Sequence, residues 1–371
     1  MESHPPHAPE SLKRLSLATA RIEAIGTAVP SLDVHRTFIE WAERQLAERR
    51  DKILFRRMAG RAGIRHRWSV LPPGEGGSPV APGGFYAGEL SPTTSARMDI
   101  YAEAAPPLAL DAIADLAAKT DIDGITHLVV ASCTGFVAPG IDQIIAAELG
   151  LDPGVERTLV GFMGCYAAVA ALRTAYHIVR SERSARVLVV TVELSTLHLQ
   201  FTGQVESLLA MLQFGDGAAA ALVTARGPGL AISNPFSASV ADSADLIRWT
   251  IGDSGFAMQL SGQVPVRIAG ALTEGALRAR MLGDLAPDSI DAWAVHAGGR
   301  SILDAVESAL GLGPDALRES RDVLARFGNL SSSTLMFVLA AILADPQRRN
   351  GIALAFGPGL AAEGFRFERA P

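Results

Sequence analysis

The sequence predicts a layered α/β fold, and three observations lead to this prediction. Patterns typical of strands and of helices alternate through most of the chain, as in α/β proteins. The chain has 371 residues, more than the roughly 250–300 at which one hydrophobic core stops growing, so we expect two core-bearing halves. Apolar residues make up 49% and charged residues only 19%, which predicts large buried faces and excludes a disordered chain.

Hydrophobic patterning predicts the individual elements in chain order. Short apolar runs are typical of buried strands and occur at His127–Ala131, Arg186–Val192, Ala218–Thr224, Ala292–His296 and Gly351–Phe356. Longer segments with helical spacing lie between them, at Tyr101–Lys119, Ile141–Leu149, Tyr166–Arg180 and Thr334–Ala344.

Two segments are predicted to be loops. Leu71–Gly84 is dense in proline and glycine, and Ser233–Ser243 is rich in serine. We place a boundary close to the second loop, which gives an N-terminal half of residues 21–230 and a C-terminal half of residues 231–371. Residues 1–20 are expected to form a loose tail, and their polar start lacks the apolar region of a signal peptide.

Charge and cysteine content exclude several function classes. The net charge is −6, so no basic surface for a nucleic acid is expected. The longest apolar run, Leu335–Ala344, has ten residues and is too short to span a bilayer. The two cysteines, Cys133 and Cys165, cannot form a disulfide framework or a four-thiolate zinc site. These features favour a cytoplasmic protein without a membrane span.

Cys165 is a candidate nucleophile. It follows an apolar run and Gly164, and it precedes a segment with helical periodicity. A cysteine at such a turn lies at a helix N-terminus, where backbone N–H groups stabilise a thiolate. The alternative is a buried, inert cysteine, which describes most free cysteines.

His296 and Asn329 are candidate partners for that cysteine. His296 ends a strand-like run before Gly298 and Gly299, and Asn329 follows Gly328 just before an apolar helix. Each is a structural residue more often than a functional one, when taken alone. Together, a cysteine, a histidine and an asparagine can accept an acyl group and hold a developing oxyanion.

Three further motifs are weaker. Asp216-Gly217 is most simply a hairpin turn. Gly357-Pro358-Gly359 resembles part of a dinucleotide fingerprint, but no βαβ unit fits after it, so we reject NAD binding there. An arginine cluster is either a solvated face or a binding site for the phosphates of an acyl carrier such as coenzyme A, and comprises Arg56, Arg57, Arg61, Arg65 and Arg67.

Taken together and in this order, the motifs resemble the type III polyketide synthases, the chalcone synthase-like family. The resemblance covers about residues 21–367 and rests on Gly164-Cys165, the Phe214–Gly217 motif, His296 with Gly298-Gly299, Gly328-Asn329 and the Gly357–Leu360 motif. It implies a homodimeric thiolase fold, five-layered αβαβα and built from two similar halves, with no prosthetic group.

The resemblance also implies roles for the three candidate residues. Cys165 would take a starter acyl group from an acyl-CoA, while His296 and Asn329 bind malonyl-CoA and promote its decarboxylation. The enolate would then attack the acyl-cysteine, and the cycle would repeat before cyclisation. Paired N–H donors lower such a barrier because negative charge collects on the thioester oxygen, and a cationic histidine would favour the thiolate.

Other family positions correspond to residues of this chain. Phe214 and Met258 match two gatekeeping phenylalanines, the second of which is replaced. Coenzyme A contacts correspond to Arg57, Arg61, Gly298, Gly299 and Ser301. A third basic position holds Leu54, for which Lys52 or Arg56 could compensate.

Cavity positions predict the substrate class. Those that line the family's active site hold Cys133, Thr134, Ser195, His198 and Ser331, and Trp249 stands where chalcone synthases have glycine. Thr134, Ala138 and Ser195 match an acyl tunnel of bacterial members that use fatty acyl starters. We therefore expect a fatty acyl-CoA starter and an alkylpyrone or alkylresorcinol product, with a packed core role for Ala138 as the alternative.

Three alternatives remain open. A β-ketoacyl-carrier-protein synthase III has the same fold and residues, although its histidine begins a His-Gln-Ala-Asn run that is absent after His296. A papain-like hydrolase also uses Cys, His and Asn, but its cysteine context is absent. A binding protein that kept the fold and lost the chemistry is the third.

Overall fold

The computed structural model describes residues 18–88 and 90–370. Within these residues one mixed sheet has the strand order β11-β12-β13-β8-β1-β7-β6-β4-β5. Its strands are β1 (Arg21–Ala28), β4 (His127–Ser132), β5 (Glu156–Gly161), β6 (Val187–Leu194), β7 (Asp216–Thr224), β8 (Gly229–Ser239), β11 (Ala292–Val295), β12 (Asn350–Gly357) and β13 (Ala361–Ala370). The expected α/β class is confirmed.

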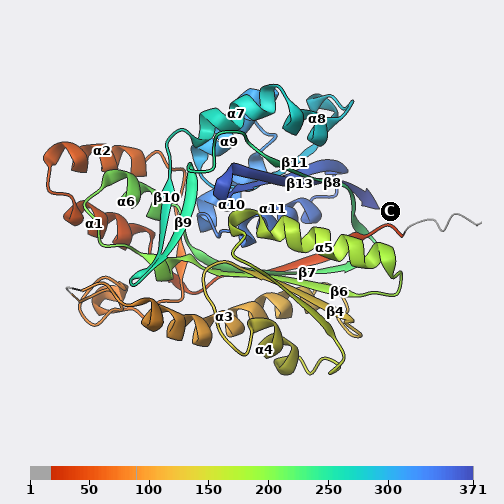
Figure 1. Cartoon of the computed structure of the whole chain (residues 1–371), viewed down its shortest axis with the longest axis horizontal. Helices are drawn as coiled ribbons and strands as arrows, with labels where there is room; N and C mark the ends of the chain where they lie inside the picture. The colour runs from red at the N-terminus through yellow and green to blue at the C-terminus, as the bar shows by residue number, and fades with distance from the viewer. Residues whose placement is uncertain (1–17, 89, 371) are drawn as a thin grey trace, which may run out of the picture.

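The lower and upper parts of this sheet alternate with three layers of helices, so that the molecule has five layers (Figure 1). From bottom to top in that view lie α3 and α4, then β7, β6 and β4, then α5 and α11, then β13, β8 and β11, and finally α7 to α9. The sheet passes from its lower to its upper part where Arg21 and Ile22 of β1 pair with Ala231 and Leu230 of β8. The order α, β, α, β, α confirms the thiolase-type layering that the resemblance implies.

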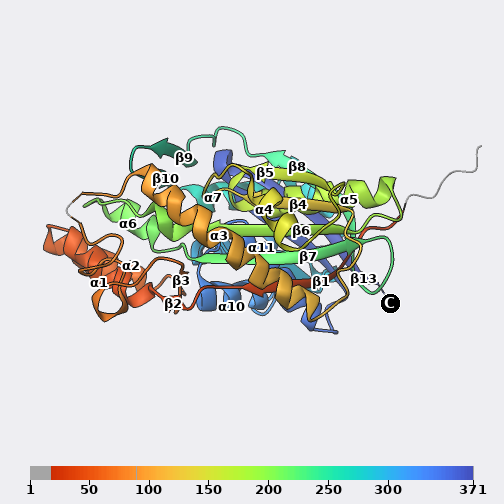
Figure 2. The same ribbon diagram turned by 90° about the horizontal axis from the view of Figure 1, so that it is seen from below.

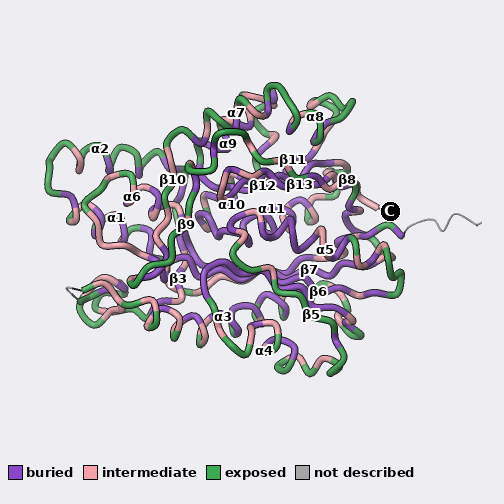
Figure 3. Tube along the Cα trace, viewed as in Figure 1, coloured by how far each residue is buried: buried purple, intermediate pink, exposed green. Residues whose placement is uncertain are grey.

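The outer layers are amphipathic helices. Figure 2 shows α3 and α4 lying across the strands of the lower sheet, and the trace in Figure 3 is buried toward the strands and exposed on the outside. These helices are α3 (Thr94–Ala117), α4 (Ile141–Glu148), α7 (Val264–Thr273), α8 (Ala276–Leu282) and α9 (Arg300–Leu310), whereas α10 (Arg318–Phe327) lies beside α11.

The central layer consists of α5 (Ala167–Ser181) and α11 (Ser333–Ala344). Residues 333–339 of α11 are all buried, because both sheets cover the helix and leave no polar face. The long apolar run of the sequence is therefore a core helix. None of the helices described here has the length and apolarity that crossing a membrane requires.

A group of small elements extends beyond the sheet on the left of Figure 1. Their apolar side chains share one hydrophobic core with the upper layers. This core contains Phe38 of α1 and Leu208 of α6 together with Ile302 of α9. The group comprises β2 (Leu32–Asp33), α1 (His35–Gln45), α2 (Arg49–Ala59), β3 (Trp68–Ser69), α6 (Val205–Met211), β9 (Ile247–Gly252) and β10 (Gly255–Leu260).

Two local predictions are wrong. Most of Ser233–Ser243 is strand β8 rather than a loop, because β13 pairs with it and Ile232 and Phe236 point into the core. Asp216-Gly217 begins strand β7 rather than turning a hairpin. The Asp216 carboxylate is buried and accepts hydrogen bonds from the backbone N–H groups of Val70 and Thr196, so it ties β7 to two neighbouring segments.

The remaining local predictions fare better. The five predicted strands and four predicted helices are found within a few residues of their expected bounds, except that α3 begins earlier, at Thr94. Gly357–Leu360 connects the antiparallel strands β12 and β13, which leaves no βαβ unit and agrees with the rejection of NAD binding. Of the expected tail, residues 1–17 lie outside the described residues.

Candidate active site

Cys165 lies at the turn between β5 and α5, in a short 3₁₀ segment (Gly164–Tyr166). Gly164 has φ +77°, and a Cβ there would lie 2.4 Å from the Cδ atom of Pro358. Both the left-handed conformation and the close approach of Pro358 therefore require glycine. The turn presents the cysteine at the start of the central helix, as the sequence predicted.

His296 and Asn329 meet from different elements. His296 directly follows β11, and Asn329 lies between α10 and α11. The Nε2 atom of His296 lies 3.2 Å from the Oδ1 atom of Asn329. The backbone of Asn329 is fixed to the segment before β7, because its N–H donates to the Gln213 carbonyl at 2.7 Å and its carbonyl accepts from the Gly215 N–H at 3.1 Å.

The hydrogen bonds orient the Asn329 amide and the imidazole. The Ser331 N–H donates to Asn329 Oδ1 at 2.9 Å, which identifies that atom as the acceptor. His296 Nε2 must then carry the proton that faces it. The Asn329 Nδ2 atom makes one long contact, 3.4 Å to the Gly298 carbonyl. The His296 Nε2–H group thus faces Asn329 Oδ1, and Asn329 Nδ2 is the donor with the weaker partner.

Ser331 connects the cysteine to this pair. Its hydroxyl lies 3.7 Å from the Cys165 sulfur, and its backbone holds the left-handed value φ +50°, which is strained for a serine. The structure thus brings together Cys165, His296, Asn329 and Ser331.

Burial determines the charge states of the cysteine and the histidine. It raises the pKa of the Cys165 thiol to about 12 and lowers that of His296 to about 4. At neutral pH these shifts leave a thiol and a neutral imidazole. Burial thus acts against the thiolate and the cationic histidine that the resemblance implies, and here removal from water outweighs the helix terminus.

A carboxylate that sequence reasoning missed lies beneath the site. Glu193 on β6 is fully buried, and its Oε2 atom accepts from the Cys133 N–H at 3.0 Å and from the Thr134 hydroxyl at 2.9 Å. The Ser332 hydroxyl donates to the other oxygen. Burial raises the pKa of Glu193 to about 7. A single charged residue inside an apolar strand was the signal that could have identified it.

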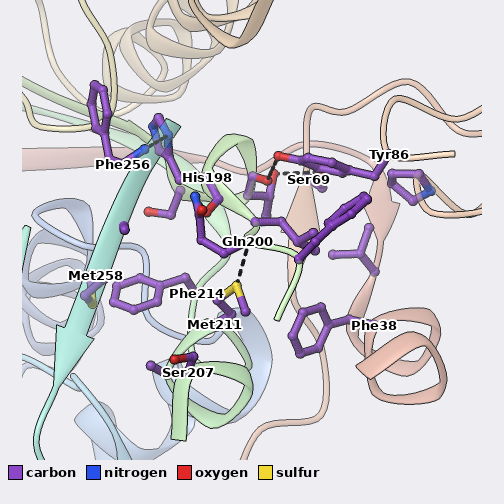
Figure 4. A pocket seen from close by; sticks show the side chains of 18 of the residues that line it. Phe38, Ser69, Tyr86, His198, Gln200, Ser207, Met211, Phe214, Phe256 and Met258 are labelled. Carbon is purple, nitrogen blue, oxygen red and sulfur yellow. Dashed lines mark hydrogen bonds between the residues drawn. The ribbon is translucent and has the colours of Figure 1, made fainter. Parts of the chain in front are cut away.

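A cavity of about 300 Å³ lies on the side toward α1 (Figure 4). Cys165, His296 and Asn329 are not among the residues that line it. Five of the predicted substrate-binding residues line it, namely Ser195, His198, Phe214, Trp249 and Met258. His198 stacks on Phe256, with ring centroids 4.1 Å apart, and its Nε2 atom lies 2.7 Å from the Thr134 carbonyl. Further wall residues come from α1, the 71–84 loop, the 196–202 segment, α6 and β10. Sequence reasoning did not connect the first of these elements with the site.

Four other predicted cavity residues do not line this cavity. Thr134 and Ser331 are buried in the hydrogen-bond networks described above, and Cys133 packs against the Gly164 backbone. Ala138 is exposed on the surface of the single chain. The alternative of a packed core role for Ala138 is therefore wrong for the single chain.

The basic face predicted to bind coenzyme A is only partly as expected. Arg57 and Arg61 are exposed beside the start of α9, where the Arg300 side chain contacts the Arg61 carbonyl at 3.4 Å. Gly298 and Gly299 are buried, and Ser301 is exposed. Arg56, however, is bound by Glu43 through two hydrogen bonds of 2.6 and 2.8 Å, which disfavours a compensating role. Leu54 is exposed and uncharged.

One member of the arginine cluster is not a surface residue. Arg67 is 2% exposed, and its guanidinium donates to the carbonyl of Phe214 at 2.7 Å. The expectation of a solvated face is wrong at this position, because the segments around Arg67 supply backbone acceptors that replace water.

A five-layered fold that brings a buried cysteine, histidine and asparagine together defines a condensing enzyme of the thiolase type. Comparisons with known proteins specify the class further. The family model "Chalcone and stilbene synthases, N-terminal domain" matches residues 10–228, and the corresponding C-terminal model matches residues 231–370. The chain belongs to the chalcone and stilbene synthase family.

Individual relatives agree with this assignment. The chain is 35% identical over 287 residues to the alpha-pyrone synthesis polyketide synthase-like Pks18 of Mycobacterium tuberculosis, covering 73% of this chain and 72% of that protein. It is 35% identical to bisdemethoxycurcumin synthase of Oryza sativa, covering 74% and 73%. The crystal structure of PKS-I from the brown alga Ectocarpus siliculosus matches with a TM-score of 0.87 at 28% identity, covering 96% and 100%.

The protein is thus a type III polyketide synthase, an acyltransferase that uses acyl-CoA and malonyl-CoA. The alternative of a β-ketoacyl-carrier-protein synthase III finds no support in these matches, and neither does a papain-like hydrolase.

Proposed function

We propose that Cys165 accepts the starter acyl group and that His296 and Asn329 activate malonyl-CoA. In the first step the Cys165 sulfur attacks the thioester carbonyl of the starter, and coenzyme A leaves. Since burial favours the thiol over the thiolate, His296 acts as the base that takes the thiol proton as the attack begins. The free Nδ1 atom of His296, which has no partner among the described residues, is available to hold that second proton.

In the second step the malonyl thioester oxygen takes the place of Asn329 Oδ1 as the acceptor for His296 Nε2–H and also accepts from Asn329 Nδ2. Loss of carbon dioxide places negative charge on the thioester oxygen, and two N–H groups aimed at one oxygen stabilise that charge. The resulting enolate carbon attacks the acyl-cysteine and forms the new carbon–carbon bond. Transfer of the extended chain back to Cys165 permits another cycle. The observation that carries this proposal is the pairing of His296 Nε2 with Asn329 Oδ1 at 3.2 Å, together with Ser331, which contacts both Asn329 and the Cys165 sulfur.

We infer that the starter is a fatty acyl-CoA and that the product is an alkylpyrone or alkylresorcinol. The cavity walls are largely apolar, with Phe38, Leu71, Val80 and Phe201 among them, and such walls bury alkyl groups favourably. The printed name of the relative Pks18 refers to alpha-pyrone synthesis, which is compatible with a pyrone. We further propose that the reaction requires no prosthetic group and takes place in the cytoplasm.

We also propose that the enzyme is a homodimer joined along β5. This strand ends the sheet, and its residues are almost all exposed. Three large apolar side chains are exposed near it, namely Phe136 (63%), Leu159 (46%) and Phe162 (56%). An uncovered strand edge beside apolar side chains favours pairing with a second chain, and a second copy would also cover the exposed Ala138.

A product screen tests the proposed function. The purified enzyme is incubated with malonyl-CoA and with starters from acetyl-CoA to palmitoyl-CoA and an aromatic acyl-CoA, and products are identified by mass spectrometry. We expect multiply extended, cyclised products from fatty acyl starters, and none from the Cys165→Ala variant. A preference for aromatic starters would refute the fatty acyl proposal. A single condensation that needs a carrier protein would restore the ketoacyl-synthase alternative.

A further inference from the structure

Helix α2 exposes large apolar side chains to solvent. Ile53 is 57% exposed, and Leu54 and Met58 are each 44% exposed. Other residues anchor the helix to the core, because its buried positions are Phe55 and Ala59, one turn apart on the inner face. Single exposed apolar residues are common on protein surfaces. Three on one helix of 11 residues indicate a surface with a function.

Arginines lie between these apolar side chains. Arg50, Ile53, Leu54, Arg57 and Met58 recur at the three- and four-residue spacing of one helix face, and all five are exposed. A stripe with this spacing ordinarily faces a protein core. Here it faces solvent and combines apolar groups with cations.

The charge around this stripe is strongly positive. Residues 49–61 carry six basic side chains and one acidic one, whereas the whole chain has a net charge of −6. Among the described residues, only one of the six has an acidic partner, since Arg56 Nη2 lies 2.6 Å from Glu43 Oε2. Two others are among the residues predicted to bind coenzyme A, but Arg49 and Arg50 have no such role. A positive region on a negative protein attracts an anionic partner.

The position of α2 leaves it accessible. Figures 1 and 2 show α2 at the far left of the molecule, beyond the sheet layers. Strand β5, at which we propose dimerisation, lies apart from α2 in Figures 2 and 3. A projecting helix offers no groove to a partner, but a fluid lipid surface adapts to it. The headgroups of an anionic bilayer attract arginines, and its acyl chains take up apolar side chains.

We propose that α2 docks the enzyme on an anionic lipid bilayer. Ile53, Leu54 and Met58 enter the region of the headgroups, and the arginines beside them bind lipid phosphates. An acidic protein is the less favoured partner, because a charged surface would leave the apolar side chains without contacts. Docking is independent of the reaction at Cys165. It places the face predicted to bind coenzyme A next to a surface in which long acyl chains dissolve.

Sedimentation with lipid vesicles tests the docking. The purified enzyme is mixed with vesicles of phosphatidylcholine alone or with about 30% phosphatidylglycerol, at low and at high salt. We expect binding to be about 10-fold stronger with phosphatidylglycerol and to weaken with salt, because salt screens the arginines. No binding to either kind of vesicle, or equal binding to both, refutes the proposal.

Paired substitutions locate the contact. Arg49→Gln with Arg50→Gln removes two charges and should weaken vesicle binding by about 10-fold or more, since each cation near the lipid surface contributes about fivefold. Arg183→Gln with Arg226→Gln removes two exposed charges outside α2 and is the matched control. Thermal unfolding shows whether each variant is folded. Equal weakening by the two pairs would mean that general charge attracts the protein, which refutes a docking site on α2.

A fluorescent label measures the insertion of the apolar side chains. Ile53→Cys and Val266→Cys, each in the Cys165→Ala background, carry an environment-sensitive fluorophore on the new thiol, and the remaining Cys133 is buried. Phosphatidylglycerol vesicles should shift the emission of the label at position 53 to the blue. They should leave the label at position 266, an exposed site (73%) on α7, unchanged. The same response at both positions refutes the insertion of α2. A shift at position 53 that appears without vesicles and grows with enzyme concentration would assign α2 to a second copy instead.

Discussion

At the scale of single residues, two neighbours act on the Cys165 thiol in opposite directions. The Ser331 hydroxyl lies 3.7 Å from the sulfur and lowers the pKa of the thiol, whereas the Glu193 carboxylate raises it. Both effects are secondary to burial, which raises this pKa to about 12. The pKa of the thiol is therefore adjusted by two contacts of opposite effect, each of which can be removed by one substitution.

These contacts predict opposite changes in cysteine reactivity. Ser331→Ala removes the hydrogen bond and should raise the pKa of Cys165, while Glu193→Gln removes the negative charge and should lower it. The pH dependence of iodoacetamide alkylation at Cys165 measures both. Alanine tolerates the left-handed backbone at this position about as well as serine, so strain is matched. Shifts of the same sign in the two variants would contradict this account.

Glu193 also makes a prediction about stability. Its pKa is about 7 in the folded protein against an ordinary value of 4.5, so the folded state holds the proton more tightly than the unfolded chain. The wild type therefore loses stability as the pH rises from about 4.5 to about 7, by up to about 3 kcal/mol, and a glutamine has no such loss. Denaturant unfolding of both proteins at several pH values measures this effect. As the pH rises, the free energy of unfolding of the wild type should fall relative to that of Glu193→Gln. A pH-independent difference would show that the carboxyl is already ionised at low pH.

At the scale of elements, α2 and the start of α9 form the basic face that we assign to coenzyme A. Replacing both Arg57 and Arg61 by alanine should raise KM for malonyl-CoA by about 10-fold and leave kcat nearly unchanged, because the lost contacts are to the carrier and not to the reacting atoms. Arg56→Ala is the matched control, since Glu43 already binds that side chain. Steady-state kinetics at two salt concentrations measure this. Equal effects of all three arginines would mean that general charge, not specific contacts, binds the carrier.

Predictions from sequence succeeded for elements whose neighbours cover them completely. The apolar runs of β4, β6 and α11 needed no partner to be recognised, because both faces are buried. Strand β8 was missed because its serines are typical of a loop. It is a strand because β13 pairs with it, and β13 lies far away in the sequence. Asp216 was misread for a related reason, as its buried carboxylate is satisfied by residues that are distant in sequence.

The same distinction applies to the site. Cys165, His296 and Asn329 each follow a strand or helix end marked by glycine, so local patterns indicated them. Glu193 and Arg67 act through contacts that no local pattern encodes, because their partners lie on other elements. The position of the cavity next to α1 could not be predicted either, because its walls come from elements that are distant in sequence.

At the scale of the whole molecule, the exposed edge at β5 predicts association. Leu159→Asp places a charge on the edge that we expect to pair with a second copy, and it should convert a dimer into a monomer. Val266→Asp is the control on an exposed position elsewhere. Light scattering coupled to gel filtration determines the mass of each. A wild-type monomer, or a Leu159→Asp dimer as stable as the wild type, would contradict the proposed interface.

The proposed function requires that a fatty acyl chain is carried on Cys165 and is extended there. The most direct measurement incubates the enzyme with dodecanoyl-CoA alone, locates the acyl group by peptide mass spectrometry, and then adds malonyl-CoA. We expect one dodecanoyl group on Cys165, which disappears as extended, cyclised product is released. An acyl group on Cys133, or one on Cys165 that malonyl-CoA does not remove, would contradict it.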